Sequence, residues 1–361
     1  MIMIIKLHIT EEVTKTMGKR LVDPNRLCMG CMQEINRPAV VCPHCGFIVN
    51  QYQRPKNSLP LYEIVNGKYL IGKVLGIGGF GITYVGWDFY QSKKVCIKEY
   101  FPRQIATRNP DASSYTDQIS VSIQYTLYEP AQYTANPSRE QQAYLKGLEA
   151  YIKEAENLSK FYLMPGIVSV RDFFYGNRTA YIVMEYIDGI NMKQYAKARG
   201  GRLMPDEVFF LLKDVLKALN EVHKKNIIHR DISPDNIMLT RERKAKLIDF
   251  GAAKDYENHE KVPVQLKQGY APIEQYTRDG NQGPWSDVYS MCASIYYLLT
   301  GIRIPNAKER QVKDTVQLLQ VLGVPVSEQQ DLAIRKGLSL DARARYQTIA
   351  ELYRDLYGEI I

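Results

Sequence analysis

One ordered run of polar residues restricts the possible folds of this chain more than any other feature. The run reads HRDISPDN over residues 229–236 and is followed by DFG over residues 249–251. In this arrangement Asp231 can accept the proton of an attacking hydroxyl group, while Asn236 and Asp249 can hold metal ions against phosphate oxygens. The pattern is long and ordered, so two unrelated polar turns on a globular surface are a poor alternative. The sequence therefore predicts a phosphoryl-transfer site.

A glycine-rich segment precedes this run and lies between two predicted strands. The segment reads GIGGFG over residues 76–81; one strand begins at Tyr69, and the other covers residues 82–87. A dinucleotide-binding fold also uses G-x-G-x-x-G, but there the glycines lead into a helix, whereas here a strand follows. The order favours a hairpin that covers the phosphates of ATP.

The next predicted strand ends in VCIK over residues 95–98. This ending resembles the V-A-I-K motif of ATP-binding domains, and the resemblance implies that Lys98 contacts the α- and β-phosphates; an ordinary lysine on an edge strand is the alternative. From residue 139 to 161 the apolar period becomes helical. Glu154 lies on the inward face of this helix, so we expect it to pair with Lys98, and Glu156 on the flank is the second candidate. The predicted apolar face consists of Leu148, Tyr151, Ala155 and Leu158.

Four cysteines near the N-terminus have the spacing of a structural zinc site. Cys28 and Cys31 form one C-x-x-C pair, and Cys42 and Cys45 form a second pair ten residues later. Four thiolates complete a closed tetrahedral site, and so short a segment depends on the metal for its folding energy. A disulfide or a redox C-x-x-C motif is the less favoured alternative. We predict a zinc ribbon over residues 28–46, with a docking role toward a protein partner or the chain's own lobes.

Later segments complete an order of motifs that is known from one family. They are GYAPIE over residues 269–274, WSD over residues 285–287, and Arg345. Together with GGFGITY over residues 78–84, KEYFP over residues 98–102 and the HRDISPDN run, they make the chain resemble the protein kinase superfamily. It is similar to bacterial serine/threonine kinases that carry an N-terminal zinc ribbon.

The resemblance covers about residues 66–360 and implies an α+β, two-lobed protein kinase fold, with a β-rich N-lobe and an α-helical C-lobe, preceded by the small ribbon. By the same resemblance, Asp287 braces the catalytic loop, and Glu274 pairs with Arg345. The expected divisions are an N-terminal extension (1–27), the zinc ribbon (28–46), a polar linker (47–65) and a kinase domain (66–361) with lobes at 66–187 and 188–361.

The activity implied is that of an ATP-dependent protein serine/threonine kinase, which uses ATP and Mg²⁺ and takes a protein as its substrate. A pseudokinase-type scaffold and a small-molecule phosphotransferase are the alternatives, and the GYAPIE segment favours a protein substrate. Mg²⁺ is expected at Asn236 and Asp249. The residues expected to contact the nucleotide are Gly76, Gly78, Gly79, Phe80, Gly81, Thr83, Cys96, Lys98, Met184, Glu185, Ile187 and Met238.

One departure from the family pattern touches the chemistry. Where these kinases carry a lysine two residues after the catalytic aspartate, this chain has Ser233, and where they carry a threonine that supports that lysine, it has Lys267. We predict that the pair is reversed, so that Lys267 reaches the γ-phosphate and the hydroxyl of Ser233 supports it. A solvated loop lysine is the equally weighted alternative. Such a contact matters because cations at a transferring phosphoryl group stabilise its charge.

The loop between these motifs also lacks the usual switch. No serine or threonine lies between Asp249 and Glu274, so we expect no activation by phosphorylation of such a residue on this loop. Arg230, which pairs with a loop phosphate in many kinases, would then take a built-in negative partner, Glu257 or Glu260.

Composition excludes several other classes of protein. The net charge of +8 is too diffuse to indicate nucleic-acid binding. The longest apolar run, residues 288–302, is too short for a membrane span, and we expect it to form a buried helix. With no signal-peptide pattern, a cytoplasmic protein is expected. Cys96 and Cys292 lie alone in apolar stretches and are expected to behave as small apolar side chains.

Overall fold

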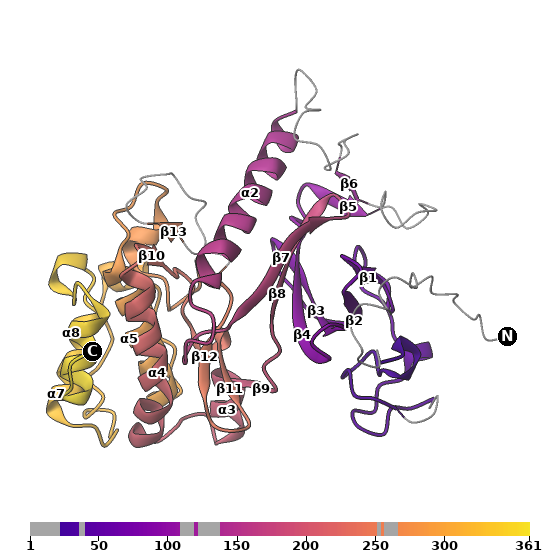
Figure 1. Cartoon of the computed structure of the whole chain (residues 1–361). Coiled ribbons are helices and arrows are strands. Elements are labelled where there is room, and N and C mark those ends of the chain that lie inside the picture. The colour runs from indigo at the N-terminus through magenta and orange to yellow at the C-terminus, as the bar shows by residue number, and fades with distance from the viewer. Residues whose placement is uncertain (1–21, 36–39, 109–118, 122–137, 251–253, 256–265) are drawn as a thin grey trace. The chain divides into compact units, whose positions relative to one another are not determined.

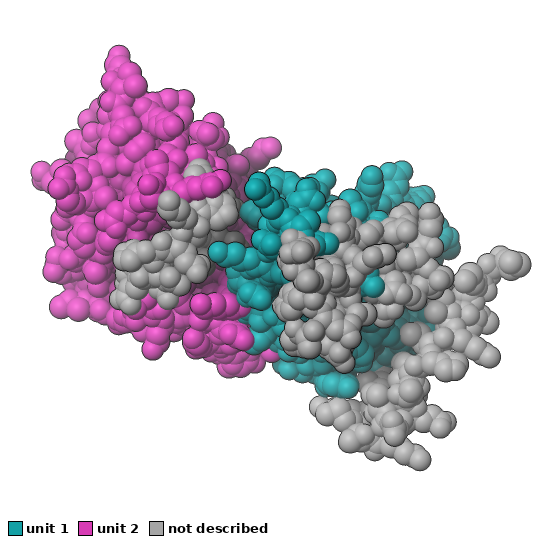
Figure 2. Space-filling model, turned by 90° about the horizontal axis from the view of Figure 1, so that it is seen from above, with its two compact units in different colours: residues 1–152, 172–186 teal, residues 153–171, 187–361 magenta. Residues whose placement is uncertain are grey.

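The computed structural model describes residues 22–35, 40–108, 119–121, 138–250, 254–255 and 266–361. The chain divides into two compact units, shown in different colours in Figure 2. Unit 1 contains residues 1–152 and 172–186, and unit 2 contains residues 153–171 and 187–361.

Unit 1 is built on an antiparallel sheet (Figure 1). Among the described residues six strands pair in the order β1-β2-β3-β4-β8-β7. Along β4 buried and partly exposed side chains alternate between Lys94 and Glu99, as expected for a strand with different neighbours on its two faces. Their bounds are β1 Ile64–Val65, β2 Tyr69–Ile77, β3 Gly81–Asp88, β4 Lys93–Tyr100, β7 Val170–Gly176 and β8 Thr179–Glu185.

Helix α2, Arg139–Ser159, confirms the predicted helix and its apolar face. All four residues predicted for that face are buried, and Tyr144 extends it by one turn. The ring of Tyr100 at the end of β4 packs between Tyr144 and Tyr151, with ring centroids 5.3 Å apart in both pairs. The helix is therefore fixed to the sheet by a cluster of three tilted aromatic rings.

The segment 47–65, expected from its composition to be a linker, is packed along the sheet. Ser58 and Leu59 are buried, and the segment ends in strand β1, which pairs with β2. The backbone N–H of Leu59 donates to the hydroxyl of Tyr84 at 2.9 Å. Three polar side chains of the segment, Tyr52, Asn57 and Ser58, also form hydrogen bonds, whereas Gln51, Gln53 and Lys56 are exposed.

The insertion at 103–138 contains a short hairpin. Strand β5, Ala106–Arg108, pairs with β6, Ile119–Val121. Arg108 of β5 is buried and forms an ion pair with Glu99 of β4, which is also buried. The same guanidinium donates to the carbonyl of Asn57. The insertion and the segment 47–65 therefore meet at one buried ion pair.

Unit 2 is mainly helical and contains a small sheet in the order β12-β11-β9. The apolar run is confirmed as a buried helix, α5, and no described helix is long and apolar enough to cross a membrane. The helices are α3 Met192–Ala198, α4 Pro205–His223, α5 Pro284–Thr300, α6 Ala307–Val312, α7 Glu328–Gly337 and α8 Ile349–Tyr357. The strands are β9 Gly189–Asn191, β10 Ile227–Ile228, β11 Ile237–Thr240, β12 Ala245–Leu247 and β13 Lys254–Asp255.

The buried ion pair yields a stability prediction. Arg108→Met leaves the Glu99 carboxylate buried without its cation, so the free energy of unfolding should fall by about 3–5 kcal/mol in urea titrations. Because two neutral side chains need no charge pairing, Arg108→Met with Glu99→Gln should recover part of this loss. Arg103→Met, at an exposed site in the same segment, is the control. A double variant less stable than the single variant would contradict this account.

Candidate active site

The glycine-rich segment forms the turn of a hairpin between β2 and β3, as predicted. The N–H of Gly78 donates to the carbonyl of Gly81 at 2.9 Å, and the N–H of Phe101 donates to the carbonyl of Phe80 at 2.8 Å. A Cβ atom at position 81 would lie 2.5 Å from the backbone oxygen of Glu99, so only glycine fits there. Phe80 is half exposed at the tip. The hairpin is closed against the end of β4.

The side chains expected around the nucleotide in unit 1 share one face of the sheet. Thr83 pairs with Lys98 across β3 and β4, and Cys96 pairs with Met184 across β4 and β8. Directly paired residues and alternate residues of a strand point to the same face. All four side chains are partly exposed, as is Glu185. Cys96 is therefore less buried than expected, whereas Cys292 is fully buried as expected.

Lys98 is held by helix α2 as well as by its strand. Its carbonyl accepts a hydrogen bond from the hydroxyl of Tyr151 at 2.9 Å, and its ammonium lies 5.9 Å from the centroid of that ring. On the next turn of the helix Glu154 is partly buried and Glu156 is exposed. This difference favours Glu154 as the inward carboxylate, and its pairing with Lys98 stays a prediction.

In unit 2 the predicted catalytic loop brings Asp231 and Asn236 together. The side-chain nitrogen of Asn236 donates to the carbonyl of Asp231 at 2.8 Å and to its Oδ2 at 2.7 Å. The amide oxygen is then the atom of Asn236 that can ligate a metal ion. Asp249 is exposed and has a φ of 61°, while Phe250 beside it is buried against His229, with ring centroids 4.4 Å apart.

Asp287 braces this loop, which confirms its expected role. Its two carboxylate oxygens accept the backbone N–H groups of His229 at 2.7 Å and Arg230 at 2.9 Å. Nε2 of His223, on helix α4, lies 2.8 Å from the same carboxylate. Complete burial acts to raise the pKa of Asp287, but the hydrogen bond with His223 and the neighbouring donors outweigh it and lower the pKa. The carboxylate therefore stays ionised inside the protein.

The predicted pair of Glu274 and Arg345 is also confirmed. The guanidinium of Arg345 bonds both carboxylate oxygens of Glu274, at 2.7 Å and 3.1 Å, and both side chains are almost inaccessible. This bidentate, buried ion pair holds the segment around Glu274 against the segment around Arg345.

Two glutamines that the sequence analysis did not single out surround Arg230. Nε of Arg230 donates to Oε1 of Gln282 at 2.7 Å, and Nε2 of Gln275 donates to the carbonyl of Arg230 at 2.8 Å. No motif marks either residue, so only the fold could identify them. The carboxylates expected to face Arg230, Glu257 and Glu260, lie outside the described residues.

The two residues of the proposed reversal are placed differently. Lys267 is partly buried, and its ammonium lies 3.5 Å from Oδ2 of Asp235. Burial raises the pKa of Asp231, and the positive charge of Lys267 opposes that rise. Ser233 is buried, and its hydroxyl has no hydrogen-bond partner in the described part of the chain. The expected support of Lys267 by this hydroxyl is therefore not observed; Asp235 contacts the lysine instead.

The remaining nucleotide candidates lie in unit 2. Ile187 follows β8, and Met238 lies in β11; both side chains are partly buried.

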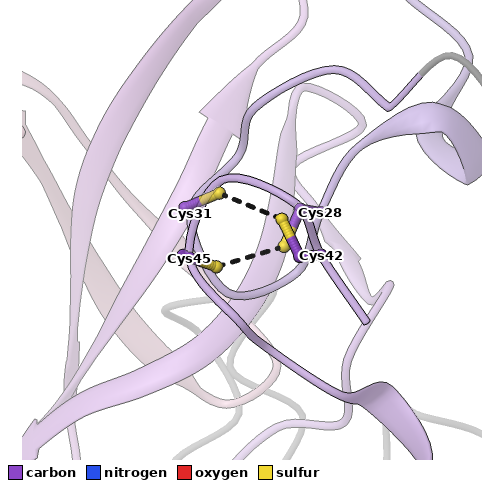
Figure 3. A group of neighbouring side chains, drawn as sticks. All are labelled: Cys28, Cys31, Cys42 and Cys45. Atoms are coloured by element: carbon purple, nitrogen blue, oxygen red, sulfur yellow. Dashed lines mark hydrogen bonds between the residues drawn. The ribbon is translucent and has the colours of Figure 1, made fainter. Parts of the chain in front are cut away.

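The four N-terminal cysteines form a cluster that fits zinc. Figure 3 shows their side chains turned toward one another, and all four sulfur atoms lie within 4.8 Å of each other. Sγ of Cys28 lies 3.7 Å from that of Cys45, and Sγ of Cys31 lies 3.8 Å from that of Cys42. Four sulfurs at about 2.3 Å from a tetrahedral Zn²⁺ are separated by about 3.8 Å, whereas a disulfide needs about 2.05 Å.

The surroundings of the cluster match the same chemistry. The N–H of Gly30 points at Sγ of Cys28, at 3.3 Å, as a donor to a metal-bound thiolate would. Gly46, directly after the last cysteine, has a φ of 72°, which explains the glycine there. Burial raises the pKa of the Cys28 and Cys31 thiols, so a bound cation is needed to keep them as thiolates.

The cluster yields a prediction on metal content. Purified full-length protein should contain one Zn²⁺ per chain by elemental analysis, and Cys31→Ser should lower this content because a closed site loses one of its four ligands. His44→Ala is the matched control: this exposed histidine lies between Cys42 and Cys45, outside the sulfur cluster, and its loss should leave the zinc content unchanged. Zinc-free wild-type protein after purification without chelators would refute the site.

Comparison with known proteins agrees with the order of motifs and with this geometry. Residues 133–350 match the protein kinase domain family. Serine/threonine-protein kinase F of Synechocystis sp. is 30% identical over 256 residues, which make up 69% of this chain and 47% of that protein. Serine/threonine-protein kinase PrkC of Bacillus subtilis is 26% identical over 302 residues, which make up 81% of this chain and 40% of that protein.

A solved structure titled "PpkA-294 apo form" superposes with a TM-score of 0.67 at 30% identity, covering 83% of this chain and 99% of that one. The chain spans less than half the length of the curated relatives named above. A match over more than half of this chain, with the catalytic-loop geometry described above, establishes its family. The chain belongs to the protein kinase domain family.

Proposed function

We propose that this protein is an ATP-dependent protein serine/threonine kinase. The observation that carries the proposal is the catalytic loop, where the Asn236 side chain is bonded to Asp231 and Asp287 holds the loop backbone. The relatives named as serine/threonine-protein kinases support the same activity. A loop held in this way has its acid-base and metal-binding groups in place before substrate arrives, which favours catalysis by positioning.

In the proposed reaction Asp231 orients the hydroxyl group of the protein substrate and accepts its proton. Lys98 and the N–H groups of the glycine-rich hairpin bind the phosphates, and Asn236 and Asp249 would hold Mg²⁺. When bound, Mg²⁺ neutralises charge on the phosphate oxygens. Because the pKa of Asp231 is raised by burial, this carboxylate is a better proton acceptor than an exposed aspartate.

Asp231→Asn tests this assignment directly. The variant should lose phosphoryl transfer to a generic protein acceptor, measured with labelled ATP, because an amide cannot accept the proton. It should still bind Mg·ATP, since Asn236 and Asp249 remain; calorimetric titration measures this binding. Equal phosphate incorporation by variant and wild type would refute the assignment.

The two alternatives predict different results in the same assays. A pseudokinase scaffold would bind Mg·ATP but transfer phosphate to no acceptor. A small-molecule phosphotransferase would leave protein acceptors unlabelled but turn over with a small hydroxyl compound. The confirmed pair of Glu274 and Arg345 favours a protein acceptor, because in this family it supports the peptide-binding segment.

We further propose that Lys267 supplies the γ-phosphate cation that a lysine at position 233 would otherwise provide. The positive charge of Lys267 lowers the pKa of Asp231. The ammonium of Lys267 lies 3.5 Å from Oδ2 of Asp235, which belongs to the same catalytic loop as Asp231. Asp235 also contacts Lys193, at 3.3 Å, but that lysine is half exposed.

Lys267→Ala should lower kcat by about 100-fold, with little change in KM for ATP, because the cation acts mainly on charge that develops during transfer. It should also move the acid limb of the kcat–pH profile to higher pH, since removing a cation raises the pKa of Asp231 further and the protonated base is inactive. Ser233→Lys with Lys267→Thr should restore part of kcat.

Lys193→Ala is the control for this prediction, because it removes the other cation on Asp235 and should change neither kcat nor its pH profile. Wild-type kcat in the Lys267→Ala enzyme would end the proposal.

A further inference from the structure

The zinc ribbon and the strand that leads into the glycine-rich hairpin share one hydrophobic core. Figure 1 shows the ribbon, in indigo, beside β1 and β2. The ribbon and the residue just before it contribute three buried side chains, and the sheet contributes three from β2, β3 and the turn after β3. The six residues are Leu27, Met29 and Met32 of the N-terminal segment and Leu70, Val85 and Phe89 of the sheet.

We call residues 28–31 the first zinc knuckle and residues 42–46 the second. The backbone of the first zinc knuckle is hydrogen-bonded to β2 at a β-bulge. The pairing of β2 with β3 shifts register between Ile71 and Val74, and there the N–H of Lys73 donates to the carbonyl of Met29 at 2.8 Å. Gly72 allows this approach: a Cβ atom at position 72 would lie 2.5 Å from the oxygen of Met29 and 2.3 Å from Cε of Met32. The bulge and the glycine are therefore shaped for the ribbon.

A second contact follows one residue further along β2. The N–H of Val74 donates to the hydroxyl of Tyr52 at 3.0 Å. The ring of Tyr52 packs on Phe47, which directly follows the second knuckle, with ring centroids 5.5 Å apart. Both knuckles thus reach consecutive amides of the same strand, Lys73 directly and Val74 through Tyr52.

These contacts end close to the residues proposed to bind the nucleotide. Val74 precedes the first glycine of the hairpin, Gly76, by two residues. Val85, in the shared core, is two residues from Thr83 on β3 and is the cross-strand partner of Cys96. By strand alternation Val85 lies on the same sheet face as Thr83, Cys96 and Lys98. The ribbon therefore borders the nucleotide-binding face.

We propose that the zinc ribbon is a positioning element of the nucleotide site, which fixes β2 so that the glycine-rich hairpin is ordered before ATP binds. The proposal rests on the proposed kinase function and gives the ribbon a role in the affinity for Mg·ATP. Residues 47–65 support it, because the N–H of Leu59 donates to the hydroxyl of Tyr84 on β3, and the side chain of Asn57 accepts the N–H of Arg108 on β5.

The physical link is the dependence of the ribbon on its metal. A four-cysteine segment of this size folds only with zinc, so loss of the metal removes the partners of the Lys73 and Val74 amides. A hairpin freed in this way must be ordered when the nucleotide binds, and that ordering weakens binding. Zinc occupancy is then coupled to nucleotide affinity without any zinc ligand contacting the nucleotide.

A two-by-two comparison tests the coupling. Full-length protein carrying Asp231→Asn, which prevents turnover, is titrated with Mg·ATP by calorimetry with zinc bound and after zinc removal by a thiol-specific reagent and chelator. The same pair of titrations is made with Gly72→Ala added, which displaces the first knuckle without touching a zinc ligand. Hydrogen exchange of residues 69–85 is measured on all four samples in the absence of nucleotide.

In the protein that carries Asp231→Asn alone, removal of zinc should raise the Kd for Mg·ATP by about tenfold, equivalent to about 1.4 kcal/mol. It should also speed hydrogen exchange of the Lys73 and Val74 amides. Gly72→Ala should retain zinc yet show the same weakening, and zinc removal should then add little, because both changes break the same contact. Tyr52→Phe should speed exchange at Val74 alone, with a smaller rise in Kd.

His44→Ala, at an exposed ribbon position, should leave both measurements unchanged. Unaltered exchange of β2 after zinc removal, or equal Kd values in zinc-bound Gly72→Ala and its parent, would overturn the proposal. If zinc removal abolished binding of a protein substrate but changed neither the Kd for Mg·ATP nor the exchange of β2, the ribbon would be a docking module. That result would also overturn the proposal. Because exchange is measured without nucleotide or turnover, failure of the kinase assignment would be seen separately, as missing phosphoryl transfer.

Discussion

The buried carboxylate of Asp287 is the interaction on which the catalytic loop depends. It accepts the consecutive backbone N–H groups of His229 and Arg230, and Nε2 of His223 lies 2.8 Å from the oxygen that also accepts the His229 N–H. Arg230 has a φ of 66°, which is unusual for a residue other than glycine. Paired hydrogen bonds to an ionised group are strong enough to hold such a conformation. Asp231 follows directly in the chain. Asp287 therefore fixes the backbone that leads into Asp231, and Asn236 holds the Asp231 side chain.

Unit 1 also contains a buried carboxylate, that of Glu99 on β4, and this group anchors neighbouring side chains to the sheet. Glu99 and Arg108 pair in the interior, and Tyr84 and Tyr181 donate further hydrogen bonds to the same carboxylate. Lys98, the neighbour of Glu99, points to the opposite face of β4. The insertion therefore contacts one face of β4, and the other face carries Lys98, which is proposed to bind the phosphates.

The charged side chains around the catalytic loop are neutralised or held by neighbouring side chains of unit 2. Arg230 is buried beside two neutral glutamines, and one of them accepts its Nε hydrogen bond. Asp235 lies between Lys193 and Lys267, so that a loop lysine is tied to the catalytic segment.

The sequence alone determined the family, the glycine-rich hairpin, the helices α2 and α5, and the residue types of the candidate site, because spaced motifs such as HRDISPDN and C-x-x-C specify chemistry directly. It also predicted the inward face of α2 and the pair of Glu274 and Arg345. Only the tertiary structure decided that Gln282 accepts a hydrogen bond from Arg230 and that the hydroxyl of Ser233 forms none with Lys267. It also decided that Met29 of the ribbon lies against β2 at Gly72. These contacts join residues far apart in the chain through single hydrogen bonds and close packing, which leave no periodicity or spacing in the sequence.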